Sequence, residues 1–466
     1  MGGKGDTPKM ALSFIGMAHL GGSAVGPSAR GVITPARDAA AQVLGDLRAG
    51  AMLDAALDRA ALRLDARDRR WLYELVYGTL RRRAWLDAVL DARVRGGTAR
   101  LHPGVADLLR LGTEQLLFMR SVPPYAAIAQ TVEQVKCHHG IGAGKLANAV
   151  LRRVDRERES IEPARPSDPL DALALDTSHP RWIVARWVGR WGADRTRSLL
   201  EANNREAHTI LRPVAIVREQ LEAMLDAAGV RTTEPPLVAD SLAVPHGVAL
   251  ASLGAFQQGL CFVQDPAATI VTRYAAVPAG SVVADLCSAP GGKAFELARD
   301  ARLVVACDGS RSRLDRVRDN LRRLDLPNVM PILADARFPA LAPVDAVLLD
   351  APCTGTGTFR RHPDARWRLK PSDLAVMGAV QRALLRAAAT IVAPGGLLVY
   401  STCSLEQEEN DEQVEAFLAE HPEFTLEPPV AGTVPDSVLD AGRLRVLPDT
   451  HGTDGAFAAR FRRKRA

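Results

Sequence analysis

Apolar residues follow two different patterns along the chain. Between residues 34 and 160 they recur every three or four positions, as at Leu72, Leu75 and Val76, which predicts amphipathic helices. From residue 279 onwards, short continuous apolar runs alternate with further helical patterns. Continuous apolar strands that alternate with helices are typical of a parallel sheet covered on both faces. The pattern therefore predicts an all-helical region followed by an α/β region.

These patterns divide the chain into four segments. Residues 1–31, rich in Gly, Ala and Ser, are expected to form a disordered leader. The helical domain is expected at 32–160, with its first helix beginning at Thr34, an N-cap residue followed by proline. A Pro-rich linker and a small α+β subdomain are expected at 161–270, and the α/β domain at 271–466.

Composition narrows the class of protein. With 47% hydrophobic and 24% charged residues, the chain has the profile of a globular protein. No apolar run approaches the ~18 residues of a transmembrane helix. Its 6 cysteines have no regular spacing and form no disulfide framework, which favours reduced thiols and a cytoplasmic location. The cluster Cys137-His138-His139 lacks a second ligand group at zinc spacing, so we expect no metal, and we expect a monomer.

The positive charge is concentrated in a few arginine clusters. The net charge is +5, which is compatible with nucleic acid binding but does not require it. Basic clusters lie at 81–83, 151–158 and 460–465, and each could equally be a solvated surface. We predict that the arginines near 81–83 and 152–156 contact RNA phosphates.

The link between the first strand and the first helix of the α/β region, "CSAPGGKA", predicts a cofactor loop. Two adjacent glycines allow a tight turn and a close approach of the backbone to a ligand. The loop is not GxGxxG, so a dinucleotide is not the first choice, and a Gly-rich turn without a ligand is the alternative. The residues of this loop are Cys287, Ser288, Ala289, Pro290, Gly291, Gly292 and Lys293.

Acidic residues follow the next three strands. Asp308 ends the second strand, Asp335 the third and Asp350 the fourth. Ligands of such sheets bind beyond the carboxyl ends of the strands, where Asp308 can bond a ribose hydroxyl pair. Asp335 could accept a hydrogen bond from an exocyclic amine. A nucleoside-containing cofactor fits these acids, and without a phosphate-binding motif S-adenosylmethionine is the natural candidate.

Two cysteines stand just past the ends of two strands: Cys353 in "LLDAPCTGTG" and Cys403 in "GGLLVYSTC". C5 of a pyrimidine attacks a methyl sulfonium only after a thiolate has added at C6, and N3 then needs a proton or hydrogen bond. A nucleophilic cysteine and a nearby acid such as Asp350 are therefore the minimum set. Strands four and five of a doubly wound sheet are neighbours, so we expect all three side chains to face one pocket. Each cysteine alone fits a buried structural thiol, but together they predict cytosine C5 methylation.

The motifs "DAPCTGTGTFRRHPDARWR", "YSTCSLEQEEN" and "CSAPGGK" resemble those of the Sun/Fmu family of RNA (cytosine-5)-methyltransferases. The region 34–154, which closes with "LANAVLRR", is similar to the RNA-binding domain of the NusB antitermination factor. Together they resemble the members of the family that methylate bacterial 16S rRNA. The resemblance implies a multidomain chain, with an all-α NusB-like domain and an α/β Rossmann-like class I methyltransferase domain. It also implies S-adenosylmethionine as cofactor and RNA as partner.

The resemblance implies a role for each candidate residue. Cys403 is expected to be the nucleophile, Cys353 to assist product release and Asp350 to contact N3 of the cytosine. The cofactor-binding residues that it implies are the loop 287–293, Asp308, Asp335 and Asp350.

Several alternatives stay open at this point. DNA cytosine-5 methyltransferases use a Pro-Cys thiol as nucleophile, so only the resemblance ranks Cys403 above Cys353. A C5-methyltransferase acting on tRNA is a second alternative, whereas a DNA enzyme would need a target-recognition domain that we do not find. A non-catalytic RNA-binding assembly factor is the third, and loss of either cysteine or of Asp350 would favour it. All three residues are present.

Overall fold

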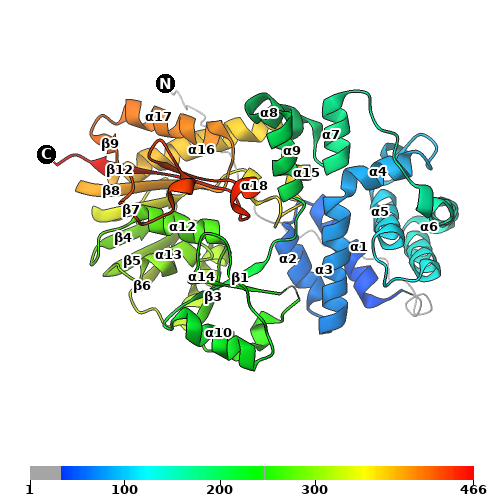
Figure 1. Cartoon of the computed structure of the whole chain (residues 1–466), viewed down its shortest axis with the longest axis horizontal. Coiled ribbons are helices and arrows are strands. Elements are labelled where there is room, and N and C mark those ends of the chain that lie inside the picture. Colours follow the sequence, from blue (N-terminus) through cyan, green and yellow to red (C-terminus); the bar gives the residue numbers. More distant parts are fainter. Residues whose placement is uncertain (1–32, 246, 466) are drawn as a thin grey trace, which may run out of the picture.

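The computed structural model describes residues 33–245 and 247–465, so the predicted leader at 1–31 lies outside the described residues. A helical part comes first along the chain, followed by three connecting helices, a small α+β part and a layered α/β part. Figure 1 shows the helical part on the right, the small part at the bottom and the α/β part on the left.

The helical part is a bundle around one apolar core. Leu72, Leu75 and Val76 are fully buried in it, as their spacing predicted. Thr34 stands at the predicted N-cap position, but its hydroxyl accepts a hydrogen bond from Arg37 Nη1 at 3.0 Å instead of capping the helix backbone. The helices are α1 (Pro35–Arg48), α2 (Leu53–Ala61), α3 (Ala66–Arg81), α4 (Arg83–Asp91), α5 (Pro103–Leu117) and α6 (Pro124–Glu157), the last broken at Gly140.

Three short helices connect the bundle to the rest of the chain: α7 (Pro169–Thr177), α8 (Arg181–Trp191) and α9 (Ala193–Ala202). Trp187 of α8 is fully buried, and its Nε1 donates to Glu406 Oε1 at 2.9 Å. Arg186 of the same helix forms ion pairs with Glu406 and Glu408. These contacts fasten α8 to the segment of the α/β part that follows Cys403.

The small part is an antiparallel sheet in the order β2-β1-β3 with one helix of ten residues. Buried Arg212 of β1 donates to Gln264 Oε1 at 2.7 Å and also bonds Glu296, which belongs to the α/β part. Its elements are β1 (Thr209–Pro213), α10 (Arg218–Ala227), β2 (Leu242–Val244), α11 (Gly254–Gln257) and β3 (Cys261–Val263).

The α/β part is built on a nine-stranded sheet in the order β10-β11-β12-β8-β7-β4-β5-β6, with β9 paired to β12. The strands β8, β7, β4, β5 and β6 run parallel, as predicted. They are β4 (Val282–Asp285), β5 (Leu303–Asp308), β6 (Val329–Leu333), β7 (Val344–Asp350) and β8 (Val392–Thr402). The fold class predicted from the sequence is confirmed, whereas the segment boundaries stay predictions.

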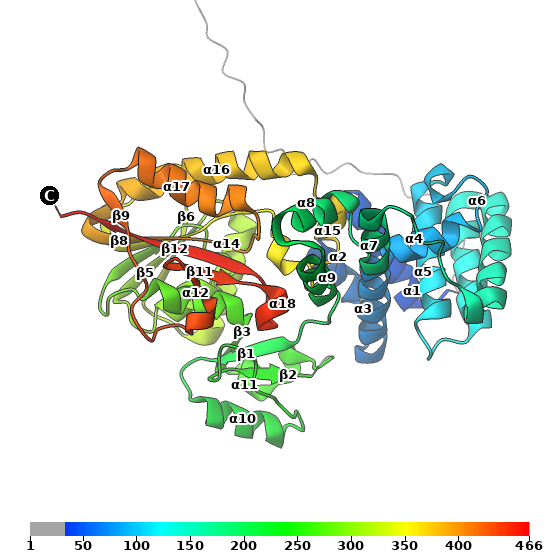
Figure 2. The same ribbon diagram turned by 45° about the horizontal axis from the view of Figure 1, so that its top comes forward.

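Helices cover both faces of this sheet. On one face pack α16 (Pro371–Thr390) and α17 (Asp411–Glu420), and on the other pack α13 (Gly292–Leu297) and α14 (Arg311–Leu324). Figure 2 shows α16 and α17 along one side of the sheet and α12 (Pro266–Ala275) on the opposite side. Two short helices, α15 (Ala365–Arg368) and α18 (Pro448–His451), complete this part.

An antiparallel extension of the sheet was not predicted. It consists of β9 (Phe424–Leu426), β10 (Leu439–Asp440), β11 (Arg443–Val446) and β12 (Ala456–Arg463). Arginines interrupt the apolar run of β12, which hid the strand from periodicity alone. In the structure Arg460 is almost completely buried and donates to Glu427 Oε1 at 2.8 Å, so a partner 33 residues away makes the buried charge tolerable.

Candidate active site

Two thiols meet at the carboxyl edge of the sheet. Cys353 lies in the turn after β7, and Cys403 directly follows β8. Because β7 and β8 are neighbouring parallel strands, both turns leave the sheet on the same side. The two Sγ atoms are 3.3 Å apart, and both side chains are half-buried. The structure thus brings together two cysteines that are fifty positions apart in the sequence.

Asp350, at the end of β7, lies next to this thiol pair. Its Oδ2 accepts from Lys293 Nζ at 2.7 Å, and its Oδ1 accepts from Ser401 Oγ at 2.8 Å. Burial alone would lower the pKa of Lys293, but the charges of Asp350 and Cys403 outweigh it and raise that pKa. A cation therefore stands beside both the carboxylate and Cys403.

The surroundings of Cys353 are different. Its hydrogen bond with Cys403 and its burial raise the pKa of the Cys353 thiol well above the usual range. The nearby carboxylate of Glu409 acts in the same direction. Cys353 is therefore held as a protonated thiol.

Sequence reasoning missed three residues of this site. Ser401, at the end of an apolar strand, bonds Asp350, while Thr354 and Glu409 bond each other beneath the thiols. The one available signal was the position of Glu409, six residues after Cys403 in an acidic run. An acidic run in isolation is more often a solvated surface, so pattern alone does not single out one of its members.

The predicted cofactor loop, residues 287–293, connects β4 to α13. Gly291 has a φ of +109°, which favours glycine, and the turn is tight as expected. However, a Cβ on Gly291 would lie 2.1 Å from the ring of Phe295, and one on Gly292 would lie 3.0 Å from Phe262. These glycines therefore also make room for the protein's own rings, and their approach to a ligand stays a prediction.

Asp308 and Asp335 lie past neighbouring strands of the same edge. Asp308 ends β5 and is buried; its Oδ1 accepts from Ser310 N at 2.8 Å and from Arg313 Nε at 3.1 Å. Asp335 lies two residues beyond β6 and is exposed. Its carboxylate pairs with Arg337 at 2.6 Å, and hydrogen bonds from Arg337 hold the pKa of Asp335 below its usual range.

The donor and acceptor atoms at this edge fit a nucleoside-containing cofactor such as S-adenosylmethionine. All hydrogen bonds that Asp308 accepts from described residues go to Oδ1, so Oδ2 is available to a ribose hydroxyl. The buried hydroxyl oxygen of Ser288 has no hydrogen-bond partner among the described residues. A buried hydroxyl without a partner is costly, and a ligand bound at the loop would satisfy it.

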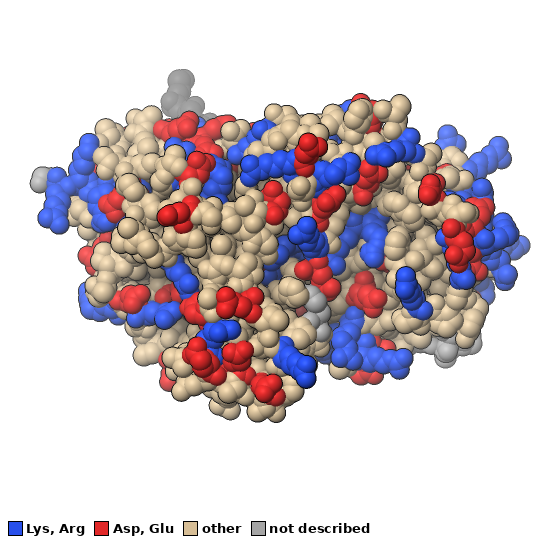
Figure 3. Space-filling view, in the orientation of Figure 1, with Lys and Arg blue, Asp and Glu red and all other residues tan. Residues whose placement is uncertain are grey.

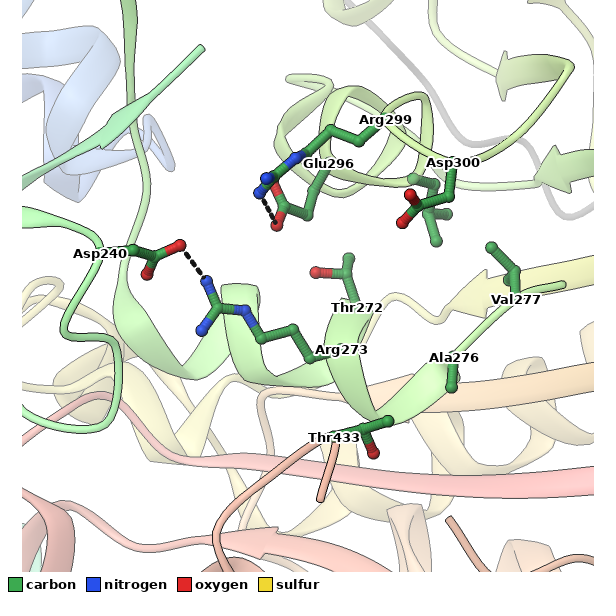
Figure 4. Close-up of a pocket in the computed structure, with 10 residues that line it drawn as sticks. Asp240, Thr272, Arg273, Ala276, Val277, Glu296, Arg299, Asp300 and Thr433 are labelled. Atoms are coloured by element: carbon green, nitrogen blue, oxygen red, sulfur yellow. Dashed lines mark hydrogen bonds and ion pairs between the residues drawn. The ribbon is translucent and has the colours of Figure 1, made fainter. Parts of the chain in front are cut away.

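A separate cavity of about 390 Å³ opens beside the C-terminal end of α13, at the other end of this helix from the thiols. Figure 4 shows that four of its five charged side chains point toward one another in two pairs. Asp240 pairs with Arg273 at 2.6 Å, and Glu296 pairs with Arg299 at 3.2 Å. Because four of the five lining charges form these two pairs, the lining indicates no particular ligand.

The predicted RNA-contacting arginines fall into two groups. Arg81, Arg82 and Arg83 are half-buried; Arg81 donates to the carbonyl of Arg360 at 3.4 Å, so this cluster lies between the bundle and the α/β part. Residues 152–156, by contrast, include three exposed arginines on α6. On the face seen in Figure 3, Lys and Arg side chains alternate with Asp and Glu. Contact with RNA phosphates therefore stays a prediction, and it now depends on the arginines of α6.

Within the described part of the chain, no helix has the length and apolar character needed to cross a membrane. Three family models match the chain. The model described as 16S rRNA methyltransferase RsmB/F matches residues 276–462, and that of the NusB family matches residues 34–156. The model for the ferredoxin-like domain of RsmF/B-like methyltransferases matches residues 179–251.

Whole proteins match over most of the chain. The ribosomal RNA small subunit methyltransferase B of Vibrio cholerae is 34% identical over 438 residues, which cover 92% of this chain and 98% of that protein. The protein of the same name from Klebsiella pneumoniae is 33% identical, with 92% and 98% covered. The crystal structure of PH0851 is 28% identical with a TM-score of 0.79, and covers 92% of this chain and 99% of its own. A methyltransferase homolog from Pyrococcus horikoshii has a TM-score of 0.54 at 26% identity, with 64% and 100% covered.

Proposed function

Because the chain belongs to the 16S rRNA methyltransferase RsmB/F family, we propose that it transfers a methyl group from S-adenosylmethionine to C5 of a cytosine in 16S rRNA. The names of its relatives support an RNA substrate, and a ribosomal substrate agrees with a cytoplasmic location. One observation supports C5 of the cytosine as the methylated atom: the thiols of Cys353 and Cys403 lie 3.3 Å apart beside the carboxylate of Asp350.

In the proposed reaction the thiolate of Cys403 adds to C6 of the cytosine. This addition forms the S–C6 bond and turns C5 into a nucleophilic enamine carbon. Asp350, in its protonated form, donates the hydrogen bond or proton that N3 requires during the addition. When bound, S-adenosylmethionine supplies the electrophilic methyl group. A base, for which water can serve, then takes the C5 proton. The electrons of the C5–H bond re-form the C5–C6 double bond, the S–C6 bond breaks, Cys403 leaves as a thiolate and N3 returns its proton to Asp350. Cys353 assists this release.

The surroundings of the two thiols support this division of roles. Lys293 interacts electrostatically with Cys403 and donates to Asp350, so the charged neighbour of Cys403 is a cation. Cys353 has the carboxylate of Glu409 as its charged neighbour, and a carboxylate favours the thiol. Chemistry alone allowed either cysteine to attack, and these charges favour Cys403.

Chain residues around the strand ends are proposed to hold the cofactor. The loop 287–293, with the unpartnered hydroxyl of Ser288, would contact it at the end of β4. Asp308 would accept hydrogen bonds from the ribose hydroxyls, and Asp335 would accept one from the exocyclic amine of the base. The pairing of Asp335 with Arg337 requires that its carboxylate bind the amine while keeping that ion pair.

Bisulfite sequencing after incubation with the purified chain tests the proposal. With 16S rRNA and S-adenosylmethionine, we expect a cytosine to become protected from conversion, and none with the Cys403→Ser variant. The target must leave its stack to be attacked, so the protected cytosine is expected in a loop or single strand. Protection in tRNA but not in 16S rRNA would overturn the substrate. Methyl incorporation without any protected cytosine would overturn the assignment to C5.

A further inference from the structure

Glu409 is a buried acid beneath the thiol pair. It ends a short 3₁₀ turn (Gln407–Glu409), and its residue is 0% exposed. A buried carboxylate is costly unless it is paired or hydrogen-bonded. Among the described residues, no Lys, Arg or His forms an ion pair with Glu409, so hydrogen bonds alone stabilise its charge.

Four donors surround this carboxylate. Its Oε1 accepts from the backbone N of Thr354 at 2.9 Å and from Gln381 Nε2 at 2.9 Å. Its Oε2 accepts from the hydroxyls of Thr354 and Ser404. Gln381, on α16, also donates to the carbonyl of Pro352 at 2.9 Å. Both oxygens are therefore fully engaged, and they are engaged with the two loops that carry the thiols.

The donors to Glu409 stand next to the two cysteines in the sequence. One donor residue directly follows Cys353, and another directly follows Cys403. A single side chain thus bonds the residue next to each thiol, across a separation of 55 residues on one side and 5 on the other.

The charges that face Cys353 all disfavour its thiolate. Cys403 and Glu409 raise the pKa of the Cys353 thiol, together with burial. Tyr400 of β8 also faces this thiol; burial and then the charge of Cys353 raise the pKa of the tyrosine, so it is neutral near pH 7. Glu409 is thus the fixed negative charge in the group around Cys353.

The charged neighbour of Cys403 is a cation. Lys293 and Asp350 form an ion pair there, and the lysine interacts electrostatically with Cys403. Two thiols at hydrogen-bond distance would otherwise compete for C6 of the base. The two thiols differ in their charged neighbours: a half-buried cation, Lys293, interacts with Cys403, and a buried anion, Glu409, interacts with Cys353.

We propose that Glu409 is a positioning residue that holds the two thiols in register and keeps Cys353 protonated, so that Cys403 alone attacks. It contacts neither RNA nor cofactor in this role and acts through Thr354, Ser404 and its own charge. The inference rests on the proposed function for the meaning of the attack, but the protonation of Cys353 can be measured without RNA.

The test measures the alkylation of Cys353 by iodoacetamide as a function of pH in a Cys403→Ser background. Adding Glu409→Gln removes the charge but can keep all four hydrogen bonds, because the two hydroxyls can turn to accept from the new amide. We expect the midpoint to fall by about one pH unit, which is about tenfold faster alkylation at a fixed pH below it. The matched control is Glu412→Gln, an exposed acid three positions further on, which should leave the profile unchanged.

A second variant separates charge from packing. Thr354→Val in the same background keeps the Glu409 charge and removes one donor, so the midpoint should not fall. Superimposable profiles with and without Glu409→Gln would overturn the inference. An equal fall in the Thr354→Val variant would also overturn it, because local packing would then set the protonation. Neither result depends on methyl transfer, so failure of the proposed function would be seen separately, by bisulfite sequencing.

Discussion

The carboxyl edge of the parallel sheet has two halves, and different kinds of hydrogen bonds stabilise them. The nucleoside half comprises residues 287–293, 308–313 and 335–337, at the carboxyl ends of β4, β5 and β6. Its acids bond close neighbours in the chain: Arg313 lies 5 positions after Asp308, and Arg337 lies 2 after Asp335.

The thiol half comprises the ends of β7 and β8 with residues 350–358 and 401–410. Here the bonds span long separations: 51 residues between Ser401 and Asp350, and 55 between Thr354 and Glu409. The nucleoside half is organised by local turns and the thiol half by contacts between strands. The two thiols therefore lie where hydrogen bonds connect segments that are far apart in the sequence.

The largest effect should come from replacing each of the two cysteines in turn. Cys403→Ser should abolish methyl transfer and form no covalent RNA adduct, because a serine hydroxyl is largely un-ionised near neutral pH. Cys353→Ser should still attack but release slowly, so that a protein–RNA adduct persists. Denaturing gel electrophoresis after incubation with RNA and cofactor distinguishes these outcomes. Cys137→Ser, in the helical part, is the control. A stable adduct from Cys403→Ser with none from Cys353→Ser would reverse the assignment.

The next effect concerns Asp285, which ends β4 between the two halves. Burial, and then the charge of Asp350, raise the pKa of the Asp285 carboxyl to about 8. The folded chain therefore keeps a proton that the unfolded chain, with an Asp pKa of about 3.9, has lost. Its contribution to stability is present at low pH and is lost as the pH rises toward about 8, with a slope of up to about 1.4 kcal/mol per pH unit.

Asp285→Asn should remove that slope, because the amide cannot ionise. Between pH 5 and pH 8 the free energy of unfolding of the wild type should fall relative to that of the variant as the pH rises. Chemical unfolding at each pH measures this difference. Asp300→Asn, an exposed acid after α13, is the control. Parallel pH profiles for the wild type and Asp285→Asn would show that the buried carboxyl does not carry this proton.

A smaller effect is expected from removing one local acid of the nucleoside half. Asp308→Ala should weaken S-adenosylmethionine binding by about 1–3 kcal/mol, since the ribose hydroxyls lose a buried acceptor. Calorimetric titration of the cofactor measures this loss. Asp315→Ala removes an exposed acid from the same helix region and should change nothing. An unchanged affinity for Asp308→Ala would remove this residue from the cofactor site.

The smallest effect should come from the helical part, far from both halves. Arg152→Glu and Arg156→Glu should each weaken RNA binding uniformly and reduce the salt dependence of the affinity by about one phosphate contact. Filter binding over a range of salt concentrations measures both. Arg302→Glu changes an exposed arginine directly before β5 and should keep the wild-type salt dependence. Equal slopes for all three variants would show that α6 does not contact phosphates.

The sequence by itself determined the elements that depend on local periodicity. The helices of the bundle, the five parallel strands and the acids and cysteines at their ends all followed from apolar spacing and from where each run stopped. Neighbouring parallel strands then imply that Cys353 and Cys403 leave the sheet on the same edge, and the structure brings them to 3.3 Å. These features are predictable because backbone geometry repeats with a fixed period within each element.

Only the tertiary structure decided which groups stand beside each thiol. Glu409 looks like any member of an acidic run until Thr354, Ser404 and Gln381 surround it. Likewise, no strand was predicted at β12, whose buried Arg460 is paired with Glu427 only in the folded chain. In both cases a charge is tolerated in the interior because its partners come from other elements of the fold. The local sequence around the charged residue does not identify those partners.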